Sequence, residues 1–390
     1  MPFVIHRFVA TALLLITGFT CSHSVAATPP TIISHILVHG ADGKFAGWPA
    51  NHGMWIWDNE ILVGFSTGIH KNLGKKHNID RDKPEHHVLA RSLDGGETWT
   101  MEFPNDRGML INEGGQRHGI TDPLHSEPSP VTISEPINFA HPHFCMTMRF
   151  QNIHGGTSRL YYSYDRGHNW KGPFVVPSFG QSGIMARTDY IVNSQTDCHV
   201  FLTASKSNQK EGRVICGRTT DGGINWHLIS YVGPEPNGFS IMPSTIRLNP
   251  TELLMTTRRR EGKGEDRHRW IDTWGSSNNG ESWKFLNHAV ADLGEGNPPS
   301  LIQLRDGRLV LTYGDRQTPF EIRAQLSSDG GRTWQRSFVL NTVGGGRDMG
   351  YTRSVQRPDG KVVTLYYHYT SQSVYRRISN TIWDPGTREL

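Results

Sequence analysis

Cysteine, long apolar runs and clustered charge are all scarce in this sequence of 390 residues. The chain has 4 Cys, and their spacing is not that of a zinc-binding motif. The formal net charge is +4, and its Lys and Arg are scattered rather than gathered into a basic tail. Beyond residue 27, no stretch approaches the roughly 20 apolar residues that a membrane span needs. We therefore expect neither a nucleic-acid partner nor a membrane span.

The first 27 residues have the pattern of a secretory signal. A short basic start precedes an apolar stretch over residues 8–19, and small residues stand before the expected cleavage point. Cys21 leaves a lipoprotein open as an alternative, although Phe and Thr are poor residues to precede a lipidated Cys. We expect a secreted or periplasmic protein whose mature chain, residues 28–390, is a single domain.

Three cysteines remain beyond the signal. Cys198 and Cys216 lie in two strand-like runs joined by a polar turn, so a hairpin would place them nearly opposite each other. In an oxidising compartment this leaves open either a disulfide or two buried thiols. Cys145 sits in an apolar run and is expected to be a buried bystander rather than a nucleophile.

Turn formers and aromatic residues are plentiful, with 42 Gly, 22 Pro, 11 Trp, 11 Tyr and 16 Phe, which favours an all-β fold. The pattern S/T-x-D-x-G-x-x-W recurs, as SLDGGETW, SYDRGHNW, TTDGGINW, SSNNGESW and SSDGGRTW. It predicts a tight turn: the Asp accepts bonds from backbone N–H groups, the Gly takes a positive φ, and the Trp packs back on the strand. In the fourth copy Asn278 replaces the Asp, and we still expect a turn there.

The copies begin at residues 92, 163, 219, 276 and 327, a period of roughly 50–70 residues that is typical of propeller blades. Each copy is preceded by a strand, a polar turn and another strand, and a sixth such hairpin follows the last copy. We therefore predict a six-bladed β-propeller, with seven blades as the alternative. The run TIISHILVHG, residues 31–40, is expected to add the outer strand of the last blade and so close the ring.

The five boxes resemble the Asp-box (BNR) repeats of the sialidase superfamily, and the likeness covers essentially the whole mature chain. The resemblance to sialidases implies a nucleophilic Tyr at Tyr351, in GYTRSVQRPDGKVVTLYY, and carboxylate-clamp residues at Arg258, in LLMTTR, and Arg316, in YGDR. Two departures weaken that assignment. AGWPANHG lacks the first clamp Arg, and SIMPSTIRL lacks the carboxylate that would activate the Tyr.

Other stretches are similar to the polysaccharide-active branch of this superfamily, which includes propeller ulvan lyases and enzymes that act on rhamnose–glucuronic acid linkages. These stretches are INFAHPHF, ARTDYIV, SIMPSTIRL and GEGNPPSLIQL. The resemblance implies His and Tyr around a uronic acid whose carboxylate is neutralised by Arg or a neighbouring group.

In a propeller, the loops that enter each first strand and leave each second strand surround one mouth of the channel. The side chains expected at this mouth are His70, His141, Arg187, Tyr190, Arg258, Arg316, Tyr351 and Arg353. The set is rich in His, Tyr and Arg, and we find no pair of carboxylates at matching loop positions such as a glycosidase needs. β-Elimination beside a uronic acid instead needs positive charge, a base and an acid, which Arg, His and Tyr can supply.

Our hypothesis is an enzyme that cleaves an acidic polysaccharide or oligosaccharide by β-elimination. His141 and Tyr190 would exchange the protons with help from His70, while Arg187, Arg258 and Arg316 hold the acidic sugar. Tyr351 and Arg353 are further candidates for catalysis and for binding. A glycoside hydrolase such as a divergent exo-α-sialidase and a non-catalytic glycan-binding propeller stay open. So does a structural Ca²⁺ or Zn²⁺, because such sites draw on distant residues.

Overall fold

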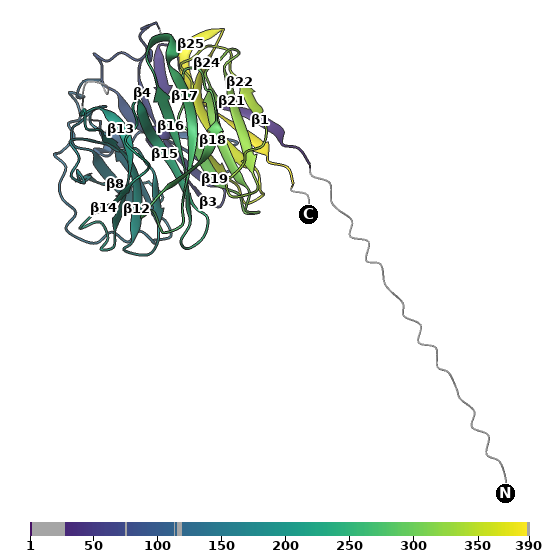
Figure 1. Cartoon of the computed structure of the whole chain (residues 1–390). Helices are drawn as coiled ribbons and strands as arrows, with labels where there is room; N and C mark the ends of the chain where they lie inside the picture. Colours follow the sequence, from purple (N-terminus) through teal and green to yellow (C-terminus); the bar gives the residue numbers. More distant parts are fainter. Residues whose placement is uncertain (2–27, 75, 113, 115–118, 388–390) are drawn as a thin grey trace.

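The computed structural model describes residues 1, 28–74, 76–112, 114 and 119–387, so the expected signal lies outside the described residues. Figure 1 shows strands of successive sheets standing side by side, with the teal middle of the chain on one side and the yellow C-terminal strands on the other. The fold is an all-β propeller. No helix in the described part of the chain is long and apolar enough to cross a membrane.

Four sheets are antiparallel, and their strands pair in chain order except that the first two short strands of the second sheet both pair with its third. The first contains β7 (Cys145–Arg149), β8 (Arg159–Ser163) and β9 (Lys171–Val175). The second contains β10 (Ile184–Met185), β11 (Tyr190–Val192), β12 (Cys198–Ser205), β13 (Glu211–Thr219) and β14 (His227–Tyr231). The third contains β15 (Phe239–Arg247), β16 (Leu253–Glu261), β17 (His268–Ser276) and β18 (Lys284–Val290). The fourth contains β19 (Ser300–Gln303), β20 (Leu309–Asp315), β21 (Glu321–Ser327) and β22 (Phe338–Thr342).

A fifth, nine-stranded sheet joins the two ends of the chain. From the N-terminal part it takes β1 (Thr31–His39), β2 (Lys44–Gly47), β3 (Met54–Trp57), β4 (Glu60–Ile69), β5 (His86–Ser92) and β6 (Thr100–Glu102). From the C-terminal part it takes β23 (Gly350–Gln356), β24 (Val362–Thr370) and β25 (Ser373–Asp384). Three short 3-10 helices complete the described elements: η1 (Pro49–Asn51), η2 (Pro104–Arg107) and η3 (Gly264–Asp266).

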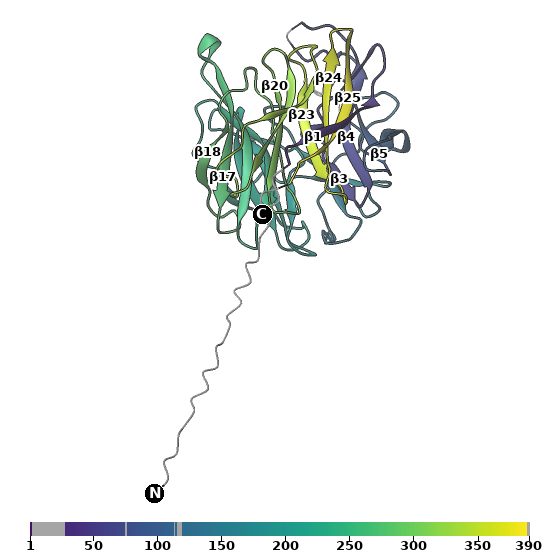
Figure 2. The same ribbon diagram turned by 90° about the vertical axis from the view of Figure 1, so that its right-hand side faces the viewer.

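Ring closure depends on β1 and β2. β1 pairs antiparallel with β25, as expected for residues 31–40, and Figure 2 shows the two strands beside β23 and β24. β2 lies between β4 and β25, and its pair with β25 is parallel, Phe45 opposite Arg376. This bridge is why the described residues form five hydrogen-bonded sheets and not the six or seven separate ones that the sequence predicted.

The five boxes adopt the expected turn. In the first copy Asp94 Oδ1 accepts from Thr98 N at 2.9 Å, Gly96 has a φ of 93°, and Trp99 Nε1 donates to Gly96 O at 3.1 Å. Sequence reasoning missed one interaction, the acceptance by Ser92 Oγ of a bond from Gly96 N at 2.7 Å. It explains why the pattern begins with Ser or Thr.

The degraded fourth copy makes the same turn with an amide. Asn278 Oδ1 accepts from Ser282 N at 3.0 Å, and Ser276 Oγ accepts from Gly280 N at 2.9 Å. The expectation that this copy still turns is confirmed, because the accepting oxygen and not the charge closes the turn.

One hairpin was assigned to the wrong pair of strands. The expected place of His141 at the mouth assumed that the strand after it is the first strand of its sheet. In the structure β7 pairs with β8, which leads directly into the box at Ser163, so β7 occupies the place of a second strand. The two kinds of hairpin have the same pattern of strand, polar turn and strand, and only the pairing distinguishes them.

The prediction that Cys198 and Cys216 lie nearly opposite each other is wrong, and of the two alternatives the structure shows two buried thiols. Cys198 lies opposite Thr219, and Cys216 lies opposite Phe201, so the two cysteines are three residues out of register. An odd offset places side chains on opposite faces of a sheet. Cys198 packs in one apolar cluster and Cys216 in another, and both are buried free thiols, as is Cys145.

The box carboxylates should make stability depend on acid. Burial alone would raise the pKa of Asp94, but bonds from Thr98, Ser92 and Glu97 lower it from 3.8 to about 2. The stabilisation is therefore complete above pH 4 and is lost as the pH falls from about 4 to 2. Asp94→Asn should lower the free energy of unfolding by about 0.5–1 kcal/mol at pH 7, the small effect expected of an exposed turn, and by almost nothing at pH 2.

Urea unfolding at pH 7, 4 and 2 measures this change. The exposed turn residue Asp58 supplies the control, Asp58→Asn, which should follow the wild type at each pH. Equal losses at pH 7 and pH 2 in Asp94→Asn would show that the carboxylate is not the group that titrates.

Candidate functional site

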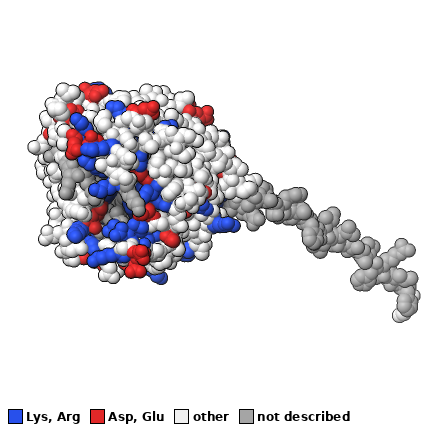
Figure 3. Space-filling view, turned by 90° about the horizontal axis from the view of Figure 1, so that it is seen from above, with Lys and Arg blue, Asp and Glu red and all other residues white. Residues whose placement is uncertain are grey.

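A cavity of about 950 Å³ opens at one mouth of the ring. Its walls come from the loops that enter β15, β19 and β23 and from the loops that leave β4, β7, β12, β16 and β20. Figure 3 shows Lys and Arg gathered around a hollow on this face of the molecule. The rule that entering and leaving loops share one mouth is therefore confirmed for this chain.

The cavity is strongly cationic. Among the described residues that line it, twelve are Lys or Arg and three are carboxylates, Glu211, Glu295 and Asp348. Glu211 pairs with Arg187 at 2.7 Å, and Glu295 pairs with Arg269 at 2.9 Å. Each carboxylate that lines the cavity is ion-paired, so none is left as an isolated negative charge.

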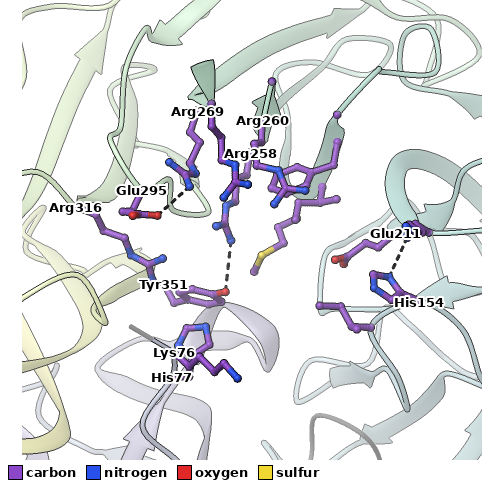
Figure 4. Close-up of a pocket in the computed structure, with 18 of the residues that line it drawn as sticks. Lys76, His77, His154, Glu211, Arg258, Arg260, Arg269, Glu295, Arg316 and Tyr351 are labelled. Carbon is purple, nitrogen blue, oxygen red and sulfur yellow. Dashed lines mark hydrogen bonds and ion pairs between the residues drawn. The ribbon is translucent and has the colours of Figure 1, made fainter. Parts of the chain in front are cut away.

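Three of the expected arginines, Arg187, Arg258 and Arg316, line the cavity. Figure 4 shows two of them, Arg258 and Arg316, beside Tyr351. Arg258 Nη1 donates to the Tyr351 hydroxyl at 3.5 Å, and the Arg316 guanidinium lies 5.7 Å from the centre of the Tyr351 ring. Arg316 is held in place by donating to Met349 O at 2.8 Å. Burial lowers the pKa of Arg258, against the opposing effect of Tyr351.

A local irregularity aims Tyr351 into the cavity. The pairing of β23 with β24 shifts between Gly350 and Arg353, and Tyr351 has a φ of 52°. Asn297 fixes this bend by accepting from Tyr351 N at 2.8 Å. Gly350 has no room for a side chain, because a Cβ would lie 2.3 Å from Asn297 Nδ2. The irregularity therefore turns the Tyr351 side chain into the cavity, which a regular strand would not do.

His77 and Asp348 form a dyad that sequence reasoning missed. His77 Nδ1 lies 2.6 Å from Asp348 Oδ1, and the two residues come from the β4–β5 loop and the approach to β23, 271 positions apart. Asp348 also accepts from Tyr367 Oη at 2.7 Å and from Arg376 Nε at 2.8 Å. No pattern in the sequence relates these two segments, because each residue lies in a loop and neither belongs to a box.

The pKa shifts of Asp348 and His77 indicate which of the two residues carries the proton. Burial alone would raise the pKa of Asp348, but His77 and Arg376 lower it well below its usual range. Burial lowers the pKa of His77, although Asp348 opposes this. A carboxylate only accepts, so the proton of neutral His77 lies on Nδ1 and leaves Nε2 as a base. Its side chain is 27% exposed and lines the cavity.

His141 lies away from the cavity. Its ring centre is 4.8 Å from that of Tyr164, which belongs to the second box, and the neighbouring His143 Nε2 lies 3.3 Å from Arg166 in the same box. This follows from the strand assignment: the loop before a second strand lies on the face of the box turns. A role for His141 beside Arg258 is therefore inconsistent with the structure.

Tyr190 is a packing residue inside the ring. Its hydroxyl accepts from Trp55 Nε1 at 2.9 Å and from Met146 N at 3.3 Å, and burial raises its pKa well above the usual range. It does not line the cavity. The expected role of Tyr190 in proton transfer is therefore not supported, because its hydroxyl is occupied and out of reach.

His70 and Arg353 also lie outside the cavity lining. The His70 ring packs edge-on against Tyr375 with centres 5.1 Å apart. Arg353 Nη2 donates to Ala50 O in η1 at 2.8 Å and to Thr188 O between β10 and β11 at 2.6 Å, so it links β23 to two other segments of the chain. Both were expected at the mouth because they lie near strand ends, but neither residue lines the cavity.

The described residues contain no group of three or more His, Cys, Asp or Glu arranged to hold a metal ion. A structural Ca²⁺ or Zn²⁺ stays a prediction, because backbone carbonyls can also hold Ca²⁺.

The fold is similar to that of known proteins. The family described as "BNR repeat-like domain" matches residues 130–364. A search of curated proteins gave no match. Among solved structures, a protein of unknown function from Dyadobacter fermentans DSM 18053 has a TM-score of 0.66 and 18% identity, over 91% of this chain and 99% of that one.

Two enzymes are also similar. The NanB sialidase from Streptococcus pneumoniae has a TM-score of 0.57 and 12% identity, over 89% of this chain and 70% of that one. The α-L-arabinanase from Penicillium chrysogenum, complexed with arabinobiose, has a TM-score of 0.56 and 13% identity, over 91% and 99%. At these identities the likeness shows a shared propeller fold.

The structural role of Tyr190 is testable. Tyr190→Phe leaves the Trp55 and Met146 donors without their acceptor inside the protein, which should lower the free energy of unfolding by about 1–2 kcal/mol. Chemical unfolding measures this, with Tyr375→Phe as the matched control, because among the described residues the half-buried Tyr375 makes no hydrogen bond through its hydroxyl. An unchanged unfolding midpoint would contradict the packing role.

Proposed function

This chain belongs to the BNR repeat-like domain family, and we propose that it is a carbohydrate-active enzyme that cleaves an acidic, uronic-acid-containing polysaccharide or oligosaccharide. One observation carries the proposal: the cavity holds twelve Lys and Arg, while its three carboxylates are already paired. Such an excess of positive charge suits an anionic ligand and disfavours a neutral one.

The side chains around Tyr351 support β-elimination. Arg258 and Arg316 bind the uronate carboxylate and so acidify its C5 proton. His77 Nε2 takes that proton, the C5–H electron pair forms the C4–C5 double bond, and the C4–O bond breaks. The Tyr351 hydroxyl gives its proton to the departing oxygen. A proton then returns from His77 to Tyr351 through water, which restores both groups.

Asp348 is a positioning residue in this scheme. It fixes the tautomer of His77 and stabilises the imidazolium that forms when the base takes its proton. Tyr367 and Arg376 hold the carboxylate in turn. The role that the sequence hypothesis gave to His141 and Tyr190 thus passes to His77 and Tyr351.

A glycoside hydrolase, such as a divergent exo-α-sialidase, is the second candidate. It is favoured by the fold shared with a sialidase and by the position of Tyr351 between Arg258 and Arg316. A usual two-carboxyl mechanism finds little support, because Glu211 and Glu295 are each bound to arginine and lie on opposite sides of the cavity in Figure 4. A non-catalytic glycan-binding propeller is the third candidate.

We propose in addition that the nine-stranded sheet counts as two blades bridged by β2, which makes six blades in all. Export after cleavage of residues 1–27 is likewise proposed, on the basis of that segment's sequence alone.

The products distinguish the three functions. Incubation with a panel of acidic polysaccharides and sialosides should give an unsaturated product that absorbs in the ultraviolet, with one new double bond for each linkage broken. New reducing ends without that absorbance would replace the lyase by the hydrolase. Retention on an acidic glycan column with neither product would indicate a binding module. A substrate whose carboxylates have been reduced to alcohols is the control and should not be cleaved.

Variants test the proton-transfer pair. His77→Gln and Tyr351→Phe should each lower turnover about 10²- to 10⁴-fold, since each removes a general acid or base. Tyr231→Phe, at a tyrosine outside the cavity lining, is the matched control and should retain wild-type turnover. Retained turnover in His77→Gln would exclude it as the base.

The pH profile provides a separate test. Burial lowers the pKa of His77 from 6.5, so the base stays unprotonated at lower pH than a free imidazole does. The acid limb of kcat/KM should therefore have its midpoint below about 6.5 and should be absent in His77→Gln. A midpoint above 7 would contradict the assignment.

A further inference from the structure

Two arginines face each other across neighbouring strands at the edge of the cavity. Arg260 near the end of β16 lies directly opposite Arg269 at the start of β17, and both line the cavity. Like charges directly opposite on an antiparallel pair destabilise a sheet. Arg267 adds a third positive charge in the connecting turn. The fold therefore retains an unfavourable interaction at this place.

Only part of this repulsion is compensated within the protein. Arg269 pairs with Glu295 at 2.9 Å, whereas no ion pair is recorded for Arg260 or Arg267 among the described residues. The Arg260 guanidinium lies over the Phe239 ring at 4.2 Å, which supports one of its faces. Burial lowers the pKa of Arg260, and the neighbouring arginines lower it further.

The backbone of Arg260 is held in a fixed position. Phe239 pairs with it across β15 and β16. Gly238 approaches so closely that a Cβ would lie 1.7 Å from the Arg260 carbonyl oxygen. The guanidinium is therefore presented to the cavity from a rigid strand and not from a mobile loop.

Arg260 is separate from the group around Tyr351. Arg258, which donates to Tyr351, stands two residues earlier on the same strand. Side chains at i and i+2 of a strand share a face and are about 6.5–7 Å apart. Such a separation suits acidic groups on two neighbouring sugar residues.

We infer that Arg260, with Arg267 and Lys263 of the β16–β17 turn, forms a second anion subsite, which binds a carboxylate or sulfate on the sugar next to the uronate. The inference rests on the proposed function for the position of that first uronate. It narrows the substrate to an oligosaccharide with acidic groups on neighbouring residues.

Binding of three matched trisaccharides tests this subsite. One carries a single uronate, the second adds a sulfate on the neighbouring sugar, and the third has two adjacent uronates. Calorimetric titration of the full chain at low salt should show about 10- to 100-fold tighter binding of at least one dianion than of the monoanion. Arg260→Gln should remove that preference, while Arg336→Ala, at an exposed arginine outside the cavity lining, should keep it.

Thermal unfolding controls for a merely structural effect. Loss of a repelled charge should leave the Tm of Arg260→Gln equal to or above that of the wild type.

Preference for the sulfated or for the diuronate trisaccharide identifies the second group, and either result supports the subsite. Equal affinities for all three, or a preference that survives in Arg260→Gln, would overturn it. Absence of cleavage with the preference intact would contradict the proposed lyase and leave the subsite standing.

Discussion

The seam formed by β2 between β4 and β25 is the constraint on which the cavity depends. It brings the N-terminal strands against the C-terminal ones and so places the β4–β5 loop beside the approach to β23. The contact of His77 with Asp348 spans that seam. A ring left open at this point would separate His77 from Asp348, even with every other sheet intact.

The groups that stabilise the fold are different from the groups that line the cavity. The box turns are closed by their own hydroxyl, carboxylate and glycine, and their bonds are local in sequence. The cavity concentrates like charges whose mutual repulsion opposes folding. Destabilising groups can gather at this mouth because the sheets that carry them are stabilised by apolar clusters that neighbouring sheets share.

The residues that could be predicted are those whose position follows from strand order. Arg258 lies in the second half of β16, Arg316 directly follows β20, and Tyr351 lies at the start of β23, so the box register alone brings them to one mouth. His141 was misplaced because a hairpin of first and second strands looks the same in sequence as one of second and third strands. Tyr190 begins a strand, as expected, but the direction of its side chain depends on the pairing of β11 with β12 and on the hydrogen bond from Trp55.

The amino-acid sequence by itself determined the repeating turn, the all-β propeller and the cationic character of one mouth, because these depend on local bonding and on a period along the chain. Only the tertiary structure decided which side chains meet there. His77 and Asp348 are joined by ring closure, and Arg260 and Arg269 by strand register. Both relations are distances between segments that no local pattern encodes.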